Sequence, residues 1–456
     1  MANLMKMVRR WRRSKASRLS ATQVISVTFA LIILLGAVLL SLPMASANGV
    51  SCGFRPALFT ATSATCVTGL VLFETGLQCS AFGKTVILCL IEIGGLGFMS
   101  VATTVVFLLR RKVGLKQRLV MAQALSISDM DGIIKLEKMV IFGSLAIQLA
   151  GALILFLRFL PMYGLRDGVI YSVFHSVSAF CNAGFDIFGH GDSLIGFNHD
   201  PVVLLTLAAL VVVGGLGFLV WEEVLRVKKF KKFSVYTKLV LVMTGALLLA
   251  GILFFLLTEW GNPDTLGPMP WYHKLLNAIF QSVTLRTAGF AAVDQALLTD
   301  AGKGISLVLM LIGGSSGSTA GGLKTVTAVV LFLFLCTRAR GRETVAVFHR
   351  TIPARQVMDA MTIAGIMISL AVFGGVFISA TSPISFTDSL FEAVSALATV
   401  GVTAGATASL SIPAQWLIML YMYFGRVGVL TISLGFLMGD RAEERFRYAQ
   451  TNLLIG

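Results

Sequence analysis

Four short segments of this chain repeat the same residue types at nearly equal spacing, and together they are suited to binding a cation. Each begins with phenylalanine and ends at a glycine nine or ten residues later. Glycine reaches backbone angles closed to other residues and leaves no side chain in the path. Carbonyl oxygens beside it can therefore face a common axis, and rings of carbonyls replace the hydration shell of potassium in selectivity filters. The glycines are Gly69, Gly184, Gly289 and Gly401, which lie 115, 105 and 112 residues apart.

We predict that the residues around these glycines form an ion-binding filter. The alternative is that the glycines only let membrane helices pack closely. That alternative fits glycines in the apolar segments that follow, but not the four that end short Ser/Thr/Ala-rich segments. The glycines interpreted as packing positions are Gly94, Gly97, Gly214 and Gly217. The predicted filter residues are Thr65, Cys66, Val67, Thr68, Gly69, Asn182, Ala183, Gly184, Thr287, Ala288, Gly289, Thr399, Val400 and Gly401.

A second glycine-rich segment interrupts a long apolar stretch at residues 313–324. It holds five glycines in twelve residues, and each costs a helix about 1 kcal/mol relative to alanine. Non-helical backbone at membrane depth is tolerated only where it is buried in protein or lines a water-filled path, so we predict a gate loop beneath the filter. The predicted gate residues are Gly313, Gly314, Ser315, Ser316, Gly317, Ser318, Thr319, Ala320, Gly321, Gly322 and Lys324, with Arg426 from the last apolar stretch.

The three cationic side chains near the predicted path can also be interpreted as structural groups. For Lys324 the alternative is an ammonium that reaches the cytosolic interface, and for Arg426 it is a structural ion pair. We interpret Arg286 as a group that braces a loop through hydrogen bonds to carbonyls.

Residues 313–317 also match the residue patterns of two catalytic motifs. Gly313, Ser315 and Gly317 have the spacing of a nucleophile elbow, which needs a strand-to-helix turn, and residues 314–317 read Gly-Ser-Ser-Gly, as in an intramembrane serine protease. No histidine lies inside a long apolar stretch, and catalysis does not explain a fourfold repeat. We therefore predict no enzyme and no organic cofactor, with an intramembrane serine protease as the remote alternative.

The composition places these segments in a membrane. The chain has 456 residues, of which 56% are apolar and 13% charged, whereas soluble domains carry about 25% charged residues. A spanning helix needs about 20 mostly apolar residues. The eight predicted spans are residues 21–43, 84–109, 138–160, 201–225, 237–258, 303–335, 357–380 and 413–437.

The distribution of basic residues predicts the orientation of the chain in the membrane. The formal net charge of +15 lies in short basic runs, and with eight spans these runs all fall on one side. The positive-inside rule makes that side cytoplasmic, so both termini are predicted to be cytoplasmic and nucleic acid is not an expected partner. The opposite links carry acidic residues such as Glu74 and Asp186, which either concentrate cations at an entrance or are ordinary solvated positions. Cys52 and Cys79 could meet on that side, although free thiols are favoured.

The repeated order of helix, short re-entrant helix, glycine-ended loop and helix predicts the fold class. We expect an all-α membrane protein of eight spans in four tandem helix–pore loop–helix repeats around a pseudo-fourfold central pore. The predicted divisions are a basic N-terminal segment (1–20), four repeats (21–118, 119–232, 233–355 with the gate loop 313–324, and 356–440) and a C-terminal tail (441–456).

On these motifs the chain resembles the Trk/Ktr/HKT superfamily of cation transporters, and it is most similar to the membrane subunit of bacterial Ktr potassium-uptake systems. The resemblance rests on residues 65–69, 178–185, 286–290 and 395–401 in order. It implies potassium uptake across the bacterial inner membrane, one filter glycine per repeat and an intramembrane gate. It also implies a homodimer, a cytosolic ring of nucleotide-binding regulatory subunits and stimulation by sodium.

The first repeat bears on the choice of ion. Related plant transporters that carry sodium have serine at the position of Gly69, so the resemblance favours potassium. A sodium-permeable or weakly selective transporter is the alternative, and the choice between channel-like flow and symport stays open.

Overall fold

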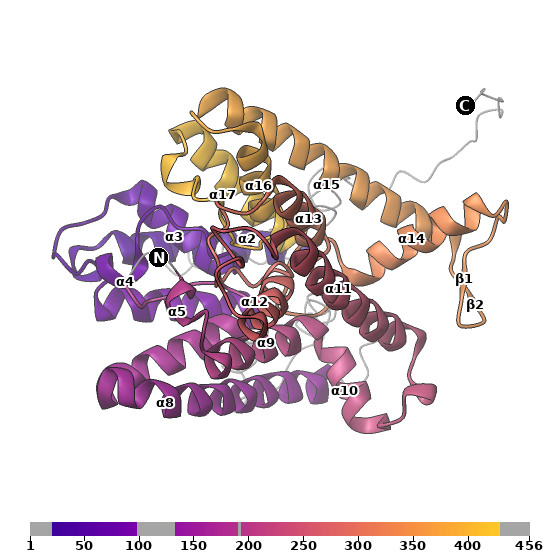
Figure 1. The fold of residues 1–456 in the computed structure, drawn as a ribbon, viewed down its shortest axis with the longest axis horizontal. Coiled ribbons are helices and arrows are strands. Elements are labelled where there is room, and N and C mark those ends of the chain that lie inside the picture. The colour runs from indigo at the N-terminus through magenta and orange to yellow at the C-terminus, as the bar shows by residue number, and fades with distance from the viewer. Residues whose placement is uncertain (1–20, 98–132, 190–192, 429–456) are drawn as a thin grey trace, which may run out of the picture.

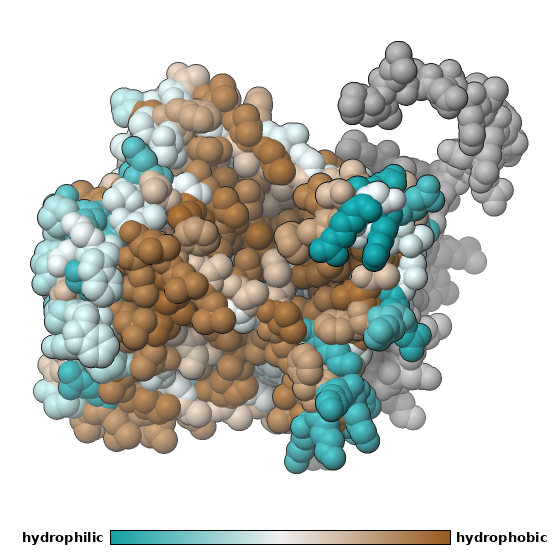
Figure 2. Space-filling view, turned by 45° about the vertical axis from the view of Figure 1, so that its right-hand side comes forward, coloured by the Kyte–Doolittle hydropathy of each residue, from teal (hydrophilic) through white to brown (hydrophobic). Residues whose placement is uncertain are grey.

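The computed structural model describes residues 21–97, 133–189 and 193–428, and these are almost entirely helical. The predicted N-terminal segment, the basic link at 110–118 and the C-terminal tail lie outside the described residues. So do the second span beyond residue 97 and the eighth beyond residue 428. Figure 2 shows a broad hydrophobic surface between two more hydrophilic ends, as expected for a chain surrounded by lipid.

The first, third and fourth predicted repeats contain a long helix, a separate shorter helix and one or two further helices, whereas in the second repeat one element, α8, takes the place of the first two (Figure 1). The first has α2 (Ala21–Ser41), α3 (Phe54–Cys66) and α5 (Ala81–Leu96); the second has α8 (Ile133–Phe180), α9 (Pro201–Leu216) and α10 (Phe218–Val227). The third has α11 (Val235–Glu259), α12 (Trp271–Thr284), α13 (Asp300–Leu311) and α14 (Thr325–Ala339); the fourth has α15 (Ala354–Thr381), α16 (Phe386–Leu397) and α17 (Ile412–Val427).

Hydroxyl side chains cap many of these helices. Ser80, Ser234 and Ser385 accept hydrogen bonds from first-turn backbone N–H groups of α5, α11 and α16, which have no partner inside the helix. Short elements make the connections: η1 (Pro43–Ala45), α4 (Thr75–Gln78), η2 (Ile195–Phe197), η3 (Phe230–Lys232), η4 (Thr407–Ser409) and the antiparallel strands β1 (Ala346–Val347) and β2 (Arg350–Thr351).

The four repeats close into a ring. The shorter helices pack on the long helices of their own repeats: α3 on α2, α12 on α11 and α16 on α15. The next contacts join neighbouring repeats, because α5 packs on α8, α9 on α12 and α13 on α16. Helix α17 packs on α3 and so joins the fourth repeat to the first. The predicted repeats therefore contact one another in a closed order, from the first to the fourth and back to the first.

The second repeat is more continuous than its sequence suggests. Helix α8 includes both the predicted third span and the short helix that follows it. Its dihedral angles leave the helical region at Gly164, which has φ 75° and ψ −175°. The chain turns back there, at the left of Figure 1, away from α10 and the β1–β2 hairpin. The basic links 226–232 and 338–355 adjoin α10, α14 and the β1–β2 hairpin, at the end of the molecule opposite this turn. Both links therefore lie at the same end, in agreement with the prediction that the basic runs share one side.

Length and hydropathy identify fewer spans than the sequence predicts. Among the described residues, α2, α8, α11 and α15 are long and apolar enough to cross a membrane, and the pair α9–α10, bent by 94°, could be a fifth. The gate segment divides the predicted sixth span into α13 and α14. Helix α9 ends at Leu216, before Gly217, and the predicted second and eighth spans are described only as far as α5 and α17 and the glycines that cap them, Gly97 and Gly428.

Candidate functional site

The four predicted filter loops share one backbone conformation. The residue two positions before each glycine has a positive φ: 57° at Val67, 59° at Asn182, 67° at Thr287 and 51° at Thr399. The glycines themselves have φ values between 68° and 100°. A positive φ is a steric outlier for β-branched residues, and three of these four residues are β-branched. Because the same strained backbone conformation occurs in all four loops, the surrounding fold must impose it. Such strain is typical of functional sites.

The four glycines converge, although they come from distant parts of the chain. A Cβ atom on Gly69 would lie 2.6 Å from the carbonyl oxygen of Ala183, and one on Gly289 would lie 2.8 Å from the Cα of Gly184. A Cβ on Gly401 would overlap the carbonyl oxygen of Thr68. Each glycine thus faces the backbone of another repeat at a distance that leaves no room for a side chain.

Hydroxyl groups on the short helices hold these loops. Ser63 and Ser395 accept hydrogen bonds from the N–H groups of Gly69 and Gly401, at 3.0 and 3.1 Å. In the other two repeats, Ser178 donates to the carbonyl of Phe185 and Thr284 to that of Phe290. The sequence analysis did not assign this role, although a Ser or Thr five or six residues before each glycine was a visible signal.

Several oxygen atoms in the loops have no hydrogen-bond partner among the described residues. They are the hydroxyls of Thr65, Thr68, Thr287 and Thr399, each on a side chain at most 1% exposed. Buried polar groups are costly unless they are satisfied, and hydroxyl oxygens are suitable ligands for a monovalent cation. Cys66 differs, because its side chain packs in the hydrophobic core with Phe59 and Leu70 and leaves only its backbone for the filter.

A cavity of about 280 Å³ opens beside the four glycines. All four line it, together with residues that follow them in the loops, including Val402 and Thr403. Glu74 and Asp186 also line this cavity. We call this cavity the vestibule; it carries two carboxyl side chains in its lining.

The gate loop lies directly against the filter loops. The Thr319 hydroxyl is within hydrogen-bond distance of the Phe180 carbonyl (3.1 Å) and the Asn182 side-chain oxygen (3.0 Å). A Cβ on Gly321 would overlap the Thr399 hydroxyl, and one on Gly322 would lie 3.4 Å from the Ala398 carbonyl. The loop therefore closes against the second and fourth filter loops, on the side away from the vestibule.

Cationic side chains fasten the gate loop. Arg426 donates to the carbonyls of Thr319, Gly94 and Gly95. It makes no ion pair within the part of the chain that the structure describes, so the ion-pair alternative is not supported there. Lys324 donates to the Ala320 carbonyl at 2.9 Å, inside the loop rather than toward an interface.

Neighbouring elements hold the rest of the loop. Arg286 donates to the Gly313 carbonyl at 3.0 Å, so it braces a loop as expected, but the loop is the gate rather than its own filter segment. From the first turn of α11, the hydroxyl of Tyr236 donates to the Ser316 carbonyl at 3.0 Å. Nothing in the local sequence marks Tyr236 for this contact.

Two further expectations can be compared with the coordinates. The packing role fits Gly94 and Gly214, where a Cβ would overlap the carbonyls of Thr65 and Phe180. Gly217 has φ 93° and a Cβ there would lie 2.5 Å from the Ser315 hydroxyl oxygen, so both packing and backbone conformation favour glycine. At Gly97, φ is 85° and no described residue lies within 4 Å of a Cβ, so the packing role is not supported there. Ser315 donates its hydroxyl to the Leu216 carbonyl and has no histidine partner among the described residues, which leaves the protease alternative without a nucleophile–base pair.

Comparisons with known proteins agree on one family. A family model described as TrkH, a cation transport protein, matches residues 3–445. The potassium/sodium uptake protein NtpJ of Enterococcus hirae is 39% identical over 444 residues, covering 96% of this chain and 98% of that protein. The Ktr system potassium uptake protein B of Bacillus subtilis is 38% identical over 431 residues, covering 94% and 96%.

A solved structure shows the same fold. The crystal structure of the potassium transporter TrkH from Vibrio parahaemolyticus has a TM-score of 0.68 and 19% sequence identity, covering 91% of this chain and 85% of that one. The apolar helices and the match to this structure define a multi-pass membrane protein. Within that class, the chain belongs to the TrkH family of cation transport proteins. Its relatives are transporters, so the expectation that it is not an enzyme is confirmed.

Proposed function

We propose that this chain is the potassium-selective, ion-translocating subunit of a bacterial potassium-uptake system. The observation that carries the proposal is the convergence of Gly69, Gly184, Gly289 and Gly401 beneath an acidic vestibule. Potassium is the transported substrate and moves inward without chemistry. The inside-negative potential favours this movement by about 2.3 kcal/mol per charge for each 100 mV.

Residues 313–324 and Arg426 form the gate in this proposal. The loop lies against the inner side of the filter, and its contacts are mostly single hydrogen bonds to backbone carbonyls. A neutral hydrogen bond contributes roughly 1 kcal/mol and one from a charged group about 1.5–3 kcal/mol, so the loop is held by many separate contacts that must be exchanged when it moves. Small residues such as Gly321 and Gly322 allow movement with few packing contacts to break.

The partners and location in this proposal follow the family. Relatives are named as proteins of a Ktr system, which supports a partner subunit. We place this subunit, a nucleotide-binding regulatory ring, on the cytosolic face. A second copy of the chain completes a homodimer in the bacterial inner membrane, with both termini cytoplasmic. The exposed basic segment 226–232 is a surface on which an acidic ring could dock, although topology alone also explains its charge.

One alternative has support of its own. The relative from Enterococcus hirae is named for both potassium and sodium, which favours a sodium-permeable or weakly selective transporter, or one in which sodium acts as an activator.

Serine substitution of the filter glycines separates these proposals. In proteoliposomes containing a folded variant, Gly401→Ser should weaken uptake of potassium and raise the relative uptake of sodium, because the side chain would strike the Thr68 carbonyl. Gly245→Ser is the matched control, since nothing lies within 4 Å of a Cβ at Gly245. Wild-type discrimination in serine variants of all four filter glycines would show that they do not form the filter.

A further inference from the structure

The residue after the repeated phenylalanine is polar and buried in all four short helices. These residues are Thr60, His175, Gln281 and Glu392, and none is more than 2% exposed. Three of them, His175, Gln281 and Glu392, contact the segment that follows the filter glycine of the same repeat, and His175 also bonds the Tyr171 carbonyl on its own helix. Gln281 exchanges hydrogen bonds with Gln295, and the ring of His175 stacks on Phe188 with the centroids 4.0 Å apart. This position therefore supports the outer part of the loop in the second, third and fourth repeats.

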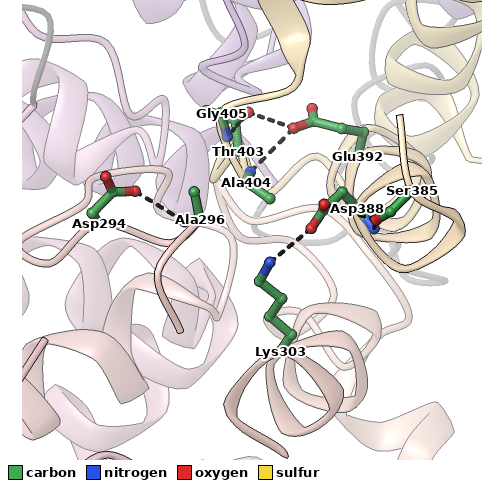
Figure 3. A network of polar contacts seen from close by, with 9 residues as sticks. All are labelled: Asp294, Ala296, Lys303, Ser385, Asp388, Glu392, Thr403, Ala404 and Gly405. Carbon is green, nitrogen blue, oxygen red and sulfur yellow. Dashed lines mark hydrogen bonds and ion pairs between the residues drawn. The ribbon is translucent and has the colours of Figure 1, made fainter. Parts of the chain in front are cut away.

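Glu392 makes the most extensive version of this contact. Its carboxylate accepts hydrogen bonds from the Thr403 hydroxyl, from the N–H of Ala404 at 3.1 Å and from the Thr407 hydroxyl at 2.7 Å. Figure 3 shows the carboxylate directed from α16 at the turn of residues 403–405. A further bond, from the N–H of Gly405 to the Thr403 hydroxyl at 3.0 Å, closes this turn. Thr403 and Thr407 also line the vestibule.

The partners of Glu392 suit a charged carboxylate. The N–H of Ala404 can only donate, the two hydroxyls can donate, and an ionised carboxylate is a pure acceptor that takes all three bonds. Hydrogen bonds to ionised groups are roughly twice as strong as neutral ones. Within the described residues no Lys or Arg pairs with Glu392, so the turn itself compensates the charge. Gln281 bonds a single residue after its glycine, His175 makes a ring contact, and Glu392 bonds three residues of the segment after its own glycine.

We propose that Glu392 is a positioning residue for ion selectivity, whose buried carboxylate fixes the outer turn of the fourth loop and thereby the carbonyls beside Gly401. This inference rests on the proposed function, because it takes the loop of Gly401 to be part of the filter. A filter discriminates between ions through the placement and number of its carbonyls. A loosened fourth loop would let these carbonyls approach the smaller sodium ion, so discrimination against sodium would fall.

Two variants on α16 distinguish the effect of holding the turn of residues 403–405 from a general effect of negative charge. Glu392→Gln keeps the size of the side chain but replaces one acceptor with an N–H₂ donor facing other donors. Asp388→Asn is the matched control on the same helix. Asp388 bonds Lys303 at 2.8 Å and Ser385 at 2.8 Å, outside the filter turn (Figure 3). Burial alone would raise the pKa of the Asp388 carboxyl, but the hydrogen bonds from Lys303 and Ser385 lower it, so this variant also removes a negative charge at neutral pH.

The measurement is uptake of radioactive rubidium into proteoliposomes, with potassium and sodium as competitors, for each purified and monodisperse variant. Glu392→Gln should reduce the potassium-to-sodium affinity ratio about tenfold, the effect of losing one or two net hydrogen bonds, with a smaller change in maximal rate. Thr407→Val, which removes one donor and leaves the carboxylate, should reduce the ratio in the same direction. Asp388→Asn should stay within about twofold of the wild type, as expected for a partly exposed ion pair.

Two results would overturn the inference. One is a wild-type ratio in both Glu392→Gln and Thr407→Val. The other is an equal loss in Asp388→Asn, which would show that charge at a distance, rather than the held turn, sets the ratio. Gly401→Ser, measured in parallel, tests the filter itself: if this variant also keeps the wild-type ratio, the proposed function has failed, and not only the role of Glu392.

Discussion

Replacing Thr319 with valine tests how firmly the gate is closed against the filter. The substitution keeps the shape of the side chain and removes one hydroxyl. That hydroxyl is shared by the Phe180 carbonyl and the Asn182 side-chain oxygen, 3.1 and 3.0 Å away, in a site where Thr319 is 1% exposed. The backbone contacts of Thr319 with Gly214 and Arg426 do not depend on the hydroxyl.

The size of the effect follows from these contacts. A net hydrogen bond contributes about 1 kcal/mol, and a buried acceptor left unpaired costs roughly 1–3 kcal/mol. Destabilising the closed state by roughly 1–2 kcal/mol shifts the closed-to-open ratio about five- to thirtyfold. Because the lost contact belongs to the closed state, flux per folded molecule should rise by up to that factor when the partner subunit is absent.

The assay is potassium uptake into proteoliposomes that contain equal amounts of folded protein. Thr319→Ser keeps the hydroxyl and should behave like the wild type. Ser318→Ala removes a hydroxyl whose own bond goes to the Ser315 carbonyl inside the loop, so it should raise flux less. Equal or lower flux in Thr319→Val, at normal abundance, would refute the reasoning.

Three further predictions concern the gate loop, its contact with Tyr236 and the basic segment 226–232. Deleting several residues of 313–324 should raise the maximal potassium flux more than it changes affinity, whereas a loop that only bends the sixth span would lose folding or flux on deletion. Tyr236→Phe removes the bond to the Ser316 carbonyl and should weaken control by a cytosolic partner while leaving potassium affinity unchanged; unaltered control, measured as flux with and without the partner, would count against this link. Neutralising Arg226, Lys228, Lys229, Lys231 and Lys232 should reduce co-purification with an acidic regulatory ring, and undiminished co-purification would exclude docking there.

Repetition made much of the architecture predictable from sequence. The intervals between the four glycines, together with the phenylalanine before each, located the short helices α3, α12 and α16 and the loops that follow them. Hydropathy alone would have missed these helices, because they are short and rich in Ser, Thr and Ala. The composition of residues 313–324 likewise predicted a break between two apolar helices, which the structure contains between α13 and α14.

Other features depended on contacts that no local pattern reveals. The left-handed conformation of Val67 opposes the preference of a β-branched residue, so only its tertiary surroundings explain it. The ion-pair alternative for Arg426 was reasonable for a buried cation, but its partners are carbonyls from repeats that are distant in sequence. Glu392 was passed over because each short helix uses a different polar side chain at that position, and its importance emerges only from the loop it contacts.

The most direct test of the central claim is the flux of the purified wild-type chain in proteoliposomes, with potassium, rubidium and sodium compared under one inside-negative potential. A filter formed by the four glycine loops predicts rapid uptake of potassium and rubidium and much slower uptake of sodium, with the difference reduced in Gly401→Ser. Equal uptake of all three ions, or a preference for sodium, by a folded protein would contradict the account.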